Sequence, residues 1–180
     1  MHDIIIHSGE KALTKDEYDK VLAACKTQED RVMVLIGVSL GIRRYDMSQL
    51  LVRNINFITN TLSYIEKKKG NRVRVVPMPP KLAQELYIYI TSQKRGINDR
   101  VFTCRDRALV DRWYKLCDDA GIPRRGIHAL RGTCVKFCQQ AGWTVEQTAK
   151  LIGDTVRVVQ MHYLTPSDAE IADLQLRRQL

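Results

Sequence analysis

A chain of 180 residues, 44% of them hydrophobic and 27% charged, is large enough for one domain with a hydrophobic core and too apolar to be a disordered segment. Its 29 lysines and arginines against 20 acidic residues give a net charge of +9, which favours a polyanionic partner. Five cysteines without a CxxC pair fit a reducing compartment, so we expect a cytoplasmic protein. No apolar stretch approaches membrane-spanning length, and the N-terminus lacks the basic region of a signal peptide, which argues against membrane insertion and secretion.

Helix signals dominate the first fifty residues. Thr14 and Glu17 form a capping box that opens a helix running to about Ala24. The dense apolar run of residues 28–40 predicts a buried central helix, which Gly41 ends. A short helix is expected to follow.

Extended segments come next. A small three-stranded antiparallel sheet is predicted, because three segments either alternate in polarity or carry β-branched side chains: residues 54–57, 61–65 and 72–76. Turns are expected between them, at residues 59–60 and 69–71.

The second half of the chain contains a series of helical patterns separated by glycine and proline. They are expected over residues 80–93, 108–120, 128–141, 144–153 and 156–163, with a last helix from Pro166 to the C-terminus and a short extended piece at residues 101–103. The predicted fold class is therefore α+β, mainly α-helical, with one small sheet.

Arg43 and Asp46 lie three residues apart just beyond the central helix. Arginine stays charged, and its planar fork can hold two non-bridging oxygens of a phosphodiester. Taken alone, Arg43 is equally typical of a surface arginine. Asp46 falls on the same helical face, where it either orients Arg43 or its partner or forms a plain surface ion pair.

Lys69 lies at the tip of a predicted β-turn, flanked by Lys67, Lys68 and Arg72. A turn tip projects its lysine outward, where it can lie beside a DNA strand and protonate a departing oxygen. The alternative is a solvated basic hairpin without a function.

His128, Arg131 and Tyr163 complete a set that suits phosphodiester chemistry. His128 and Arg131 share a helix face, so both can reach one phosphate. A structural histidine and a packed tyrosine are the ordinary alternatives for single residues. Together, however, two arginines neutralise a phosphate, a lysine and a histidine move protons, and a tyrosine is the nucleophile.

The order and wording of these motifs resemble the catalytic domain of the tyrosine recombinases, the phage integrase family with its Xer- and Cre-like members. The resemblance covers about residues 10–165. It rests on four boxes, which are Gly41-Ile42-Arg43-x-x-Asp46-Met47, Lys69-Gly70-Asn71-Arg72-Val73-Arg74-Val75-Val76-Pro77, His128-Ala129-Leu130-Arg131, and Leu151-Ile152-Gly153 followed by Tyr163.

The resemblance implies a mechanism of DNA strand breakage and rejoining. Tyr163 would attack the scissile phosphate, form a 3′-phosphotyrosyl link and release a 5′-hydroxyl. Arg43 and Arg131 would stabilise the transition state, His128 would assist proton transfer, and Lys69 would protonate the leaving oxygen. The reaction implied needs no cofactor and no metal ion.

Asp154 departs from the family pattern, because His or Trp usually follows Gly153 at that position. A carboxylate repels a phosphate unless it is protonated or paired. Two pairings are open: with Arg157 one turn along, or with a catalytic arginine. The role of Asp154 at the active site is left open by the sequence.

Double-stranded DNA is the partner that the resemblance implies, with a homo-oligomer, a tetramer on paired sites, and a monomer as the alternative without DNA. DNA contacts are expected from the basic residues beside the motifs, which are Arg44, Lys67, Lys68, Arg72 and Arg74.

The expected domain organisation is a catalytic domain over residues 1–165 and a helical tail over residues 166–180. The apolar positions of the tail would dock either on a neighbouring protomer or on its own domain. Family members usually carry an N-terminal core-binding domain, which is expected to be absent because the motifs begin by residue 41. An excised fragment or a short natural form would both fit.

Two other functions stay open from the sequence alone. A type IB topoisomerase-like enzyme would use the same chemistry to relax supercoils without exchanging strands. A non-catalytic DNA-binding relative would retain the fold and bind DNA without cleaving it. Covalent capture on nicked DNA separates this last reading from both enzymes.

Overall fold

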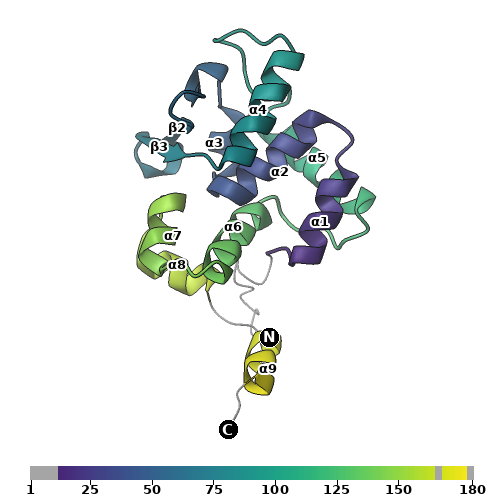
Figure 1. Ribbon diagram of the computed structural model, residues 1–180, viewed down its shortest axis with the longest axis vertical. Coiled ribbons are helices and arrows are strands. Elements are labelled where there is room, and N and C mark those ends of the chain that lie inside the picture. The colour runs from purple at the N-terminus through teal and green to yellow at the C-terminus, as the bar shows by residue number, and fades with distance from the viewer. Residues whose placement is uncertain (1–11, 165–167, 178–180) are drawn as a thin grey trace.

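The computed structural model describes residues 12–164 and 168–177 (Figure 1). Its helices are α1 (Lys15–Ala24), α2 (Gln28–Leu40), α3 (Arg44–Ser48), α4 (Pro80–Ser92), α5 (Asp106–Asp119), α6 (Ala129–Gln140), α7 (Val145–Ile152), α8 (Val156–Tyr163) and α9 (Asp168–Arg177). The strands are β1 (Ile55–Asn56), β2 (Thr61–Glu66) and β3 (Arg72–Pro77), with short 3₁₀ helices η2 (Val52–Asn54) and η3 (Lys67–Lys69). The predicted fold class, mainly helical with a small three-stranded antiparallel sheet, is confirmed.

Helix α2 forms the centre of the main hydrophobic core. Almost every residue from Val32 to Leu40 is buried, and α2 packs against α4 and α6 (Figure 1). The α2–α6 contact is close, because a Cβ atom at Gly37 would lie 2.7 Å from the Cβ of Leu130. The buried central helix predicted from the apolar run is therefore present, with α4 and α6 packed against it.

The sheet has the order β1-β2-β3, and both pairs are antiparallel. Along β2, burial alternates so that Leu62, Tyr64 and Glu66 share the inner face. Glu66 lies opposite Arg72 in the register. The β2–β3 connection is not the β-turn expected from the sequence: it contains η3, followed by Gly70 and Asn71 in the left-handed region.

A second apolar cluster joins α6, α7 and α8 beneath the main core (Figure 1). Its buried residues are Cys134, Val135, Cys138, Ala149, Ile152, Val159 and Tyr163. Packing in this cluster brings the end of α8 beside the start of α6. As a result, Tyr163 lies next to residues that precede it by more than thirty positions.

Most of the other local predictions agree with the structure. The capping boxes at Thr14 and Thr144 are present, and Gly41 caps α2 in the left-handed conformation. The extended piece expected at residues 101–103 is not a strand; a single bridge joins Leu51 to Arg100 instead.

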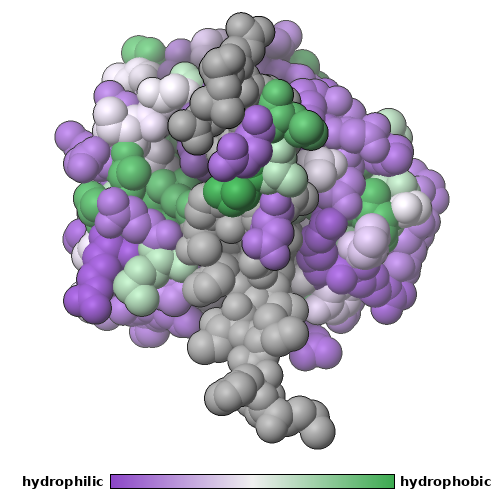
Figure 2. All heavy atoms as spheres, turned by 90° about the horizontal axis from the view of Figure 1, so that it is seen from below, coloured by the Kyte–Doolittle hydropathy of each residue, from purple (hydrophilic) through white to green (hydrophobic). Residues whose placement is uncertain are grey.

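The C-terminal helix α9 lies below the rest of the body in Figure 1. Of its apolar side chains, Ile171 and Leu176 are exposed. Pro166, Ser167 and residues 178–180 of the predicted tail lie outside the described residues. Among the coloured residues of the face seen in Figure 2, hydrophilic ones predominate, with hydrophobic patches between them. Within residues 12–164 and 168–177, no helix has both the length and the apolar character that crossing a bilayer requires.

Candidate active site

Tyr163, at the end of α8, contacts His128 at the N-terminus of α6 and Arg131 within α6. The side chain of Tyr163 is buried. Its hydroxyl lies 2.8 Å from Nε2 of His128 and accepts a hydrogen bond from Nε of Arg131 at 3.2 Å. The structure therefore brings these three predicted catalytic residues into direct contact.

His128 is the N-cap residue of α6; the residue is partly open to solvent, and its ring lies near the guanidinium groups of Arg131 and Arg43. Burial lowers the pKa of His128 to about 4, and the positive charges of Arg131 and Arg43 contribute to the decrease. The imidazole is therefore neutral at physiological pH. With its proton on Nδ1, its Nε2 can accept the proton of the Tyr163 hydroxyl.

Arg131 is almost completely buried, and all three of its guanidinium nitrogens are engaged. Its Nη1 donates to two backbone carbonyls, that of Gly41 and, at 2.8 Å, that of Ile152. Its Nη2 donates to Oδ2 of Asp154 at 2.5 Å. Two carbonyls thus fix the guanidinium from behind and leave its other edge toward Tyr163 and Asp154.

Arg43 stands between α2 and α3, immediately after the left-handed cap at Gly41. A side chain at position 41 would meet Cγ2 of Ile152 at 2.7 Å, so glycine allows the chain to turn here against α7. The guanidinium of Arg43 is only 17% exposed. Its Nη2 donates to both carboxylate oxygens of Asp154 at 3.1 Å.

Asp154 is the point at which the cations of the site converge. Besides the two arginines, Nζ of Lys69 lies 3.4 Å from its Oδ1. Burial by itself would raise the pKa of this carboxyl, but the attraction of Arg131 and Arg43 outweighs it and lowers the pKa. Of the two pairings left open by the sequence, the structure has the one with the predicted catalytic arginines, Arg43 and Arg131, and not the one with Arg157.

Lys69 differs from its predicted placement. It was expected at an outward-pointing turn tip, but it ends η3, and its amine faces Asp154. The 3₁₀ turn and the left-handed Gly70 fold the hairpin end back toward α7, which explains the difference. The side chain remains 38% exposed, so it borders both the site and the surface.

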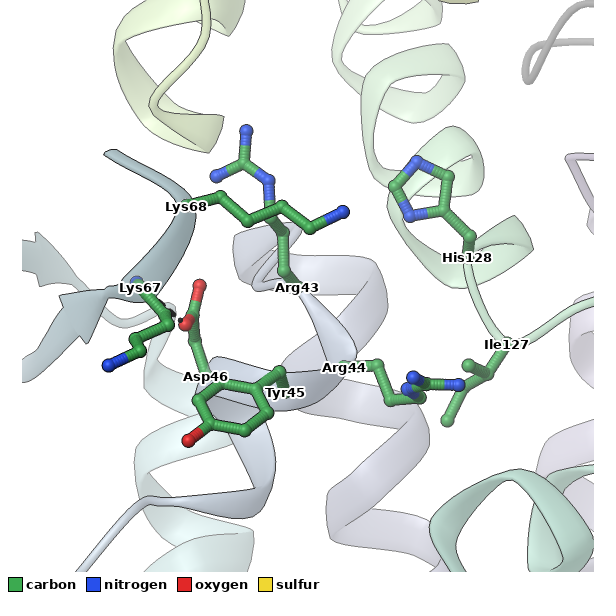
Figure 3. Close-up of a pocket in the computed structure, with 8 residues that line it drawn as sticks. All are labelled: Arg43, Arg44, Tyr45, Asp46, Lys67, Lys68, Ile127 and His128. Atoms are coloured by element: carbon green, nitrogen blue, oxygen red, sulfur yellow. Dashed lines mark hydrogen bonds between the residues drawn. The ribbon is translucent and has the colours of Figure 1, made fainter. Parts of the chain in front are cut away.

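Asp46 neither orients Arg43 by a hydrogen bond nor forms a surface ion pair. It is buried, and its Oδ1 accepts a hydrogen bond from the backbone N–H of Lys67 at 3.1 Å (Figure 3). Burial raises the pKa of this carboxyl. Asp46 therefore attaches the start of η3 to α3, and its support of the site is indirect.

The five basic residues expected to contact DNA fall into two groups. Arg44, Lys67 and Lys68 line a pocket of about 430 Å³ together with Arg43 and His128, and Figure 3 shows Lys68 extending across it toward His128. Arg44 also forms an ion pair with Asp106 at 2.6 Å.

Arg72 and Arg74 form the second group, because both bind other parts of the protein. Arg72 donates to Glu66. Arg74 donates to the carbonyls of Lys150 and Leu151 at the end of α7. A DNA contact by either residue stays a prediction.

Glu66 is the residue of the site that the sequence reasoning missed. Its side chain is fully buried and bonded to Arg43 and Arg72. A signal was present: Glu66 follows Leu62 and Tyr64 in the alternation of β2, so a charge is predicted to face inward.

Metal-binding groups are not apparent at the site. Across the part of the chain that the structure describes, no three His, Cys, Asp or Glu side chains lie together in a way that could hold a metal ion. Cys134 and Cys138 are buried within the second apolar cluster.

Comparison with known proteins identifies the family. A model of the phage integrase family matches residues 11–170. The chain belongs to the phage integrase family. Among curated proteins it is similar to tyrosine recombinase XerA of Saccharolobus solfataricus, with 27% identity over 143 residues that cover 79% of this chain and 48% of the relative. It is also similar to a tyrosine recombinase of Pseudothermotoga lettingae, with 28% identity over 170 residues that cover 89% and 58%.

Solved structures share the fold. The XerA recombinase matches with a TM-score of 0.80 and 19% identity over 94% of this chain and 66% of that one. The XerH site-specific recombinase, solved bound to its palindromic difH substrate after cleavage, matches with a TM-score of 0.70 and 17% identity over 93% and 53%. The chain thus spans about half the length of the curated relatives it matches.

Proposed function

We propose that this domain breaks and rejoins DNA strands as the catalytic part of a site-specific tyrosine recombinase. The observation that carries the proposal is the convergence of Arg43, Arg131 and Lys69 on a single anion, beside a tyrosine hydroxyl bonded to a neutral histidine. Carboxylates and phosphodiesters both present two oxygens that share negative charge, so the carboxylate of Asp154 marks a position suited to a phosphate.

The reaction follows from the contacts of each group. The oxygen of Tyr163 attacks phosphorus while Nε2 of His128 accepts its proton. A bond forms between phosphorus and the tyrosine oxygen, and the bond to the 5′ oxygen breaks. Lys69 donates a proton to that oxygen, and Arg43 and Arg131 neutralise the charge that develops on the non-bridging oxygens. One phosphate ester replaces another, so the exchange needs no nucleotide hydrolysis.

Asp154 must yield its arginine contacts when DNA binds. Its carboxylate occupies the donors that the phosphate needs, and two anions cannot share them without strong repulsion. We propose that the scissile phosphate displaces the carboxylate from at least one arginine. Asp154 would then hold the two guanidinium groups in place until DNA arrives.

Double-stranded DNA is the proposed substrate, with Arg44, Lys67 and Lys68 as phosphate contacts around the pocket of Figure 3. The net charge of +9 supports a polyanionic partner. Assembly as a homo-oligomer on paired sites is proposed from the family, and α9 is the segment suited to it.

A nicked suicide substrate tests the proposal. Cleavage near a nick releases a short fragment that diffuses away, so the covalent complex accumulates. We expect wild-type protein to give a DNA adduct that survives denaturing electrophoresis, and Tyr163→Phe to give none while its DNA affinity stays within a few-fold, because no positive charge is lost. Tyr114→Phe, which removes a hydroxyl from α5 away from the site, is the control and should form the adduct normally.

The outcomes also separate the alternatives. A wild-type protein that binds DNA but forms no adduct would be a non-catalytic relative, and the proposal would fail. Relaxation of a supercoiled plasmid without a specific site would instead favour a topoisomerase-like activity.

A further inference from the structure

The carboxylate of Glu66 is completely withdrawn from solvent at the end of β2. It lies where the hairpin meets both the α2–α3 junction and the turn between α7 and α8. Burying a carboxylate costs several kcal/mol unless good partners compensate for the loss of water. Packing alone therefore does not explain a buried charge at this position.

Both oxygens of Glu66 are bonded to arginine. Its Oε1 accepts from Nη1 of Arg43 at 3.0 Å, and its Oε2 accepts from Nε and Nη2 of Arg72 at 2.9 and 2.5 Å. Because the two oxygens have different partners, one carboxylate connects the arginine of the active site to the strand that follows Lys69.

Glu66 restrains Arg43 through a different nitrogen from the one that binds Asp154. Arg43 gives Nη1 to Glu66 and Nη2 to Asp154, so its guanidinium is fixed between two carboxylates. Arg131 has an equivalent restraint in the carbonyls of Gly41 and Ile152. Each arginine that binds Asp154 thus has a second restraint: backbone carbonyls for Arg131 and the carboxylate of Glu66 for Arg43.

The backbone before Asp154 also fits around Glu66. A Cβ atom at Gly153 would overlap Oε1 of Glu66, and Arg72 reaches the carbonyl of Gly153 at 3.5 Å. The position of the carboxylate is therefore determined from three directions, by the hairpin, by Arg43 and by the α7–α8 turn.

We propose that Glu66 is a positioning residue for strand cleavage, which acts through Arg43 by aiming its guanidinium at the scissile phosphate. The proposal rests on the function proposed above. Misplacement of a catalytic group by about 1 Å can reduce a rate by about 100-fold. Overall DNA affinity depends on many phosphate contacts and depends little on the aim of one arginine.

The test measures cleavage of the nicked substrate at saturating DNA with Glu66→Gln. We expect the rate to fall by between about tenfold and about 100-fold, with DNA affinity changed by less than about threefold. The control is Glu29→Gln: Glu29 is another buried carboxylate that binds an arginine, Arg112, at 3.0 Å between α2 and α5. Its loss should reduce stability and leave the cleavage rate of folded protein unchanged.

A double-mutant cycle with Arg43→Lys separates positioning from a general structural role. Arg43→Lys keeps the charge but loses the planar fork. If Glu66 acts through Arg43, adding Glu66→Gln to Arg43→Lys should change the rate by less than about twofold. Full additivity, or wild-type cleavage by Glu66→Gln, would overturn the proposal.

Two further outcomes are distinguishable. Absence of any adduct with wild-type protein would refute the proposed function itself. If Glu66→Gln does not fold, Glu66→Asp, whose shorter side chain withdraws the carboxylate from Arg43, provides the same test. Failure of both variants to fold at the assay temperature would assign Glu66 to folding alone and overturn the positioning role.

Discussion

At the scale of single residues, the cations that would bind a phosphate are already bonded to a carboxylate of the protein. Asp154 opposes Arg43, Arg131 and Lys69 within 3.4 Å, and Glu66 holds Arg43 from the other side. Without DNA, the cations of the site are therefore partly neutralised by two carboxylates of the same chain. Under the proposed function, a DNA phosphate would replace the carboxylate of Asp154, and this exchange can be measured.

Asp154→Asn removes the charge that compensates the buried Arg131. We expect the free energy of unfolding to fall by about 2 kcal/mol or more, because an uncompensated buried cation is costly. Sulfate, a tetrahedral anion like phosphate, should then stabilise Asp154→Asn more than wild-type protein, since the side chain no longer carries a negative charge that competes with sulfate for the arginines. The measurement is the melting temperature over a sulfate series.

Asp118→Asn provides the matched control for this series. Asp118 pairs with Arg124 on the surface, so its loss should not change the response to sulfate. Equal stabilisation of all three proteins by sulfate would mean that the carboxylate does not occupy an anion site.

His128 predicts a pH dependence of stability. The imidazole titrates near 6.5 in the unfolded chain and near 4 in the folded domain, so the unfolded chain binds more protons between these values. The contribution is complete above pH 6.5 and is lost as the pH falls toward 4. The full shift corresponds to about 2 kcal/mol between pH 7 and pH 5, and the expected loss is smaller because His128 is partly exposed and solvent screens its interactions.

Urea unfolding at pH 7 and pH 5 measures this contribution. His128→Gln should lose less stability on acidification than wild-type protein, because it removes the histidine beside Arg43 and Arg131, whereas His162→Gln should behave like wild type. Identical pH dependence for His128→Gln and wild-type protein would contradict the lowered pKa of His128.

At the scale of elements, the hairpin is attached to α7 by Arg74, a basic residue that was predicted to contact DNA. Arg74 donates two hydrogen bonds to carbonyls in the last turn of α7, at 2.5 and 2.9 Å. These carbonyls would otherwise lack intrahelical partners. The contact links β3 to the turn that carries Asp154.

Arg74→Met should therefore act on stability more than on DNA binding. We expect a loss of about 1–3 kcal/mol in the free energy of unfolding, because hydrogen bonds from a charged donor are lost. The salt dependence of DNA affinity should stay unchanged. Lys68→Met is the comparison, and it should reduce the slope of log K against log salt by about one. A reduced slope for Arg74→Met without loss of stability would make Arg74 a DNA contact.

The sequence predicted the elements better than the contacts between them. Helix ends at Thr14, Thr144 and Gly41 are local signals, and each appears where it was expected. The pairing of Arg43 with Asp154 joins residues 111 positions apart, and that of Arg43 with Glu66 joins residues 23 apart. Such contacts depend on how whole elements pack, which a local pattern does not specify.

The hairpin end shows the same limit on a smaller scale. Lys69-Gly70-Asn71 correctly indicated a reversal of the chain, but the turn type depended on more than these residues. Asp46 binds the backbone of Lys67 from α3, and this distant contact accompanies the 3₁₀ turn that faces Lys69 toward Asp154. The structure brings most of the predicted site residues together, whereas their orientation was not predictable from the sequence.

At the scale of the whole molecule, α9 is set apart from the packed body. Neither apolar cluster contains a described residue of α9, and Ile171 and Leu176 are 45% and 86% exposed. Exposed apolar side chains on a terminal helix suit docking on a second copy of the domain.

Deletion of residues 167–180 should therefore change the free energy of unfolding by less than about 0.5 kcal/mol. The shortened domain should still form the covalent adduct but no longer associate on DNA with paired sites, as measured by sedimentation. A large loss of stability on deletion would instead place the helix on its own domain.

The covalent link is the central claim, and its chemical position is the most direct test. Wild-type protein trapped on a nicked duplex can be digested with a protease, and the modified peptide identified by mass spectrometry. We predict a peptide that contains Tyr163 joined to the 3′ phosphate of the cleaved strand. An adduct on another tyrosine such as Tyr114, or DNA that is bound without any adduct, would contradict the account.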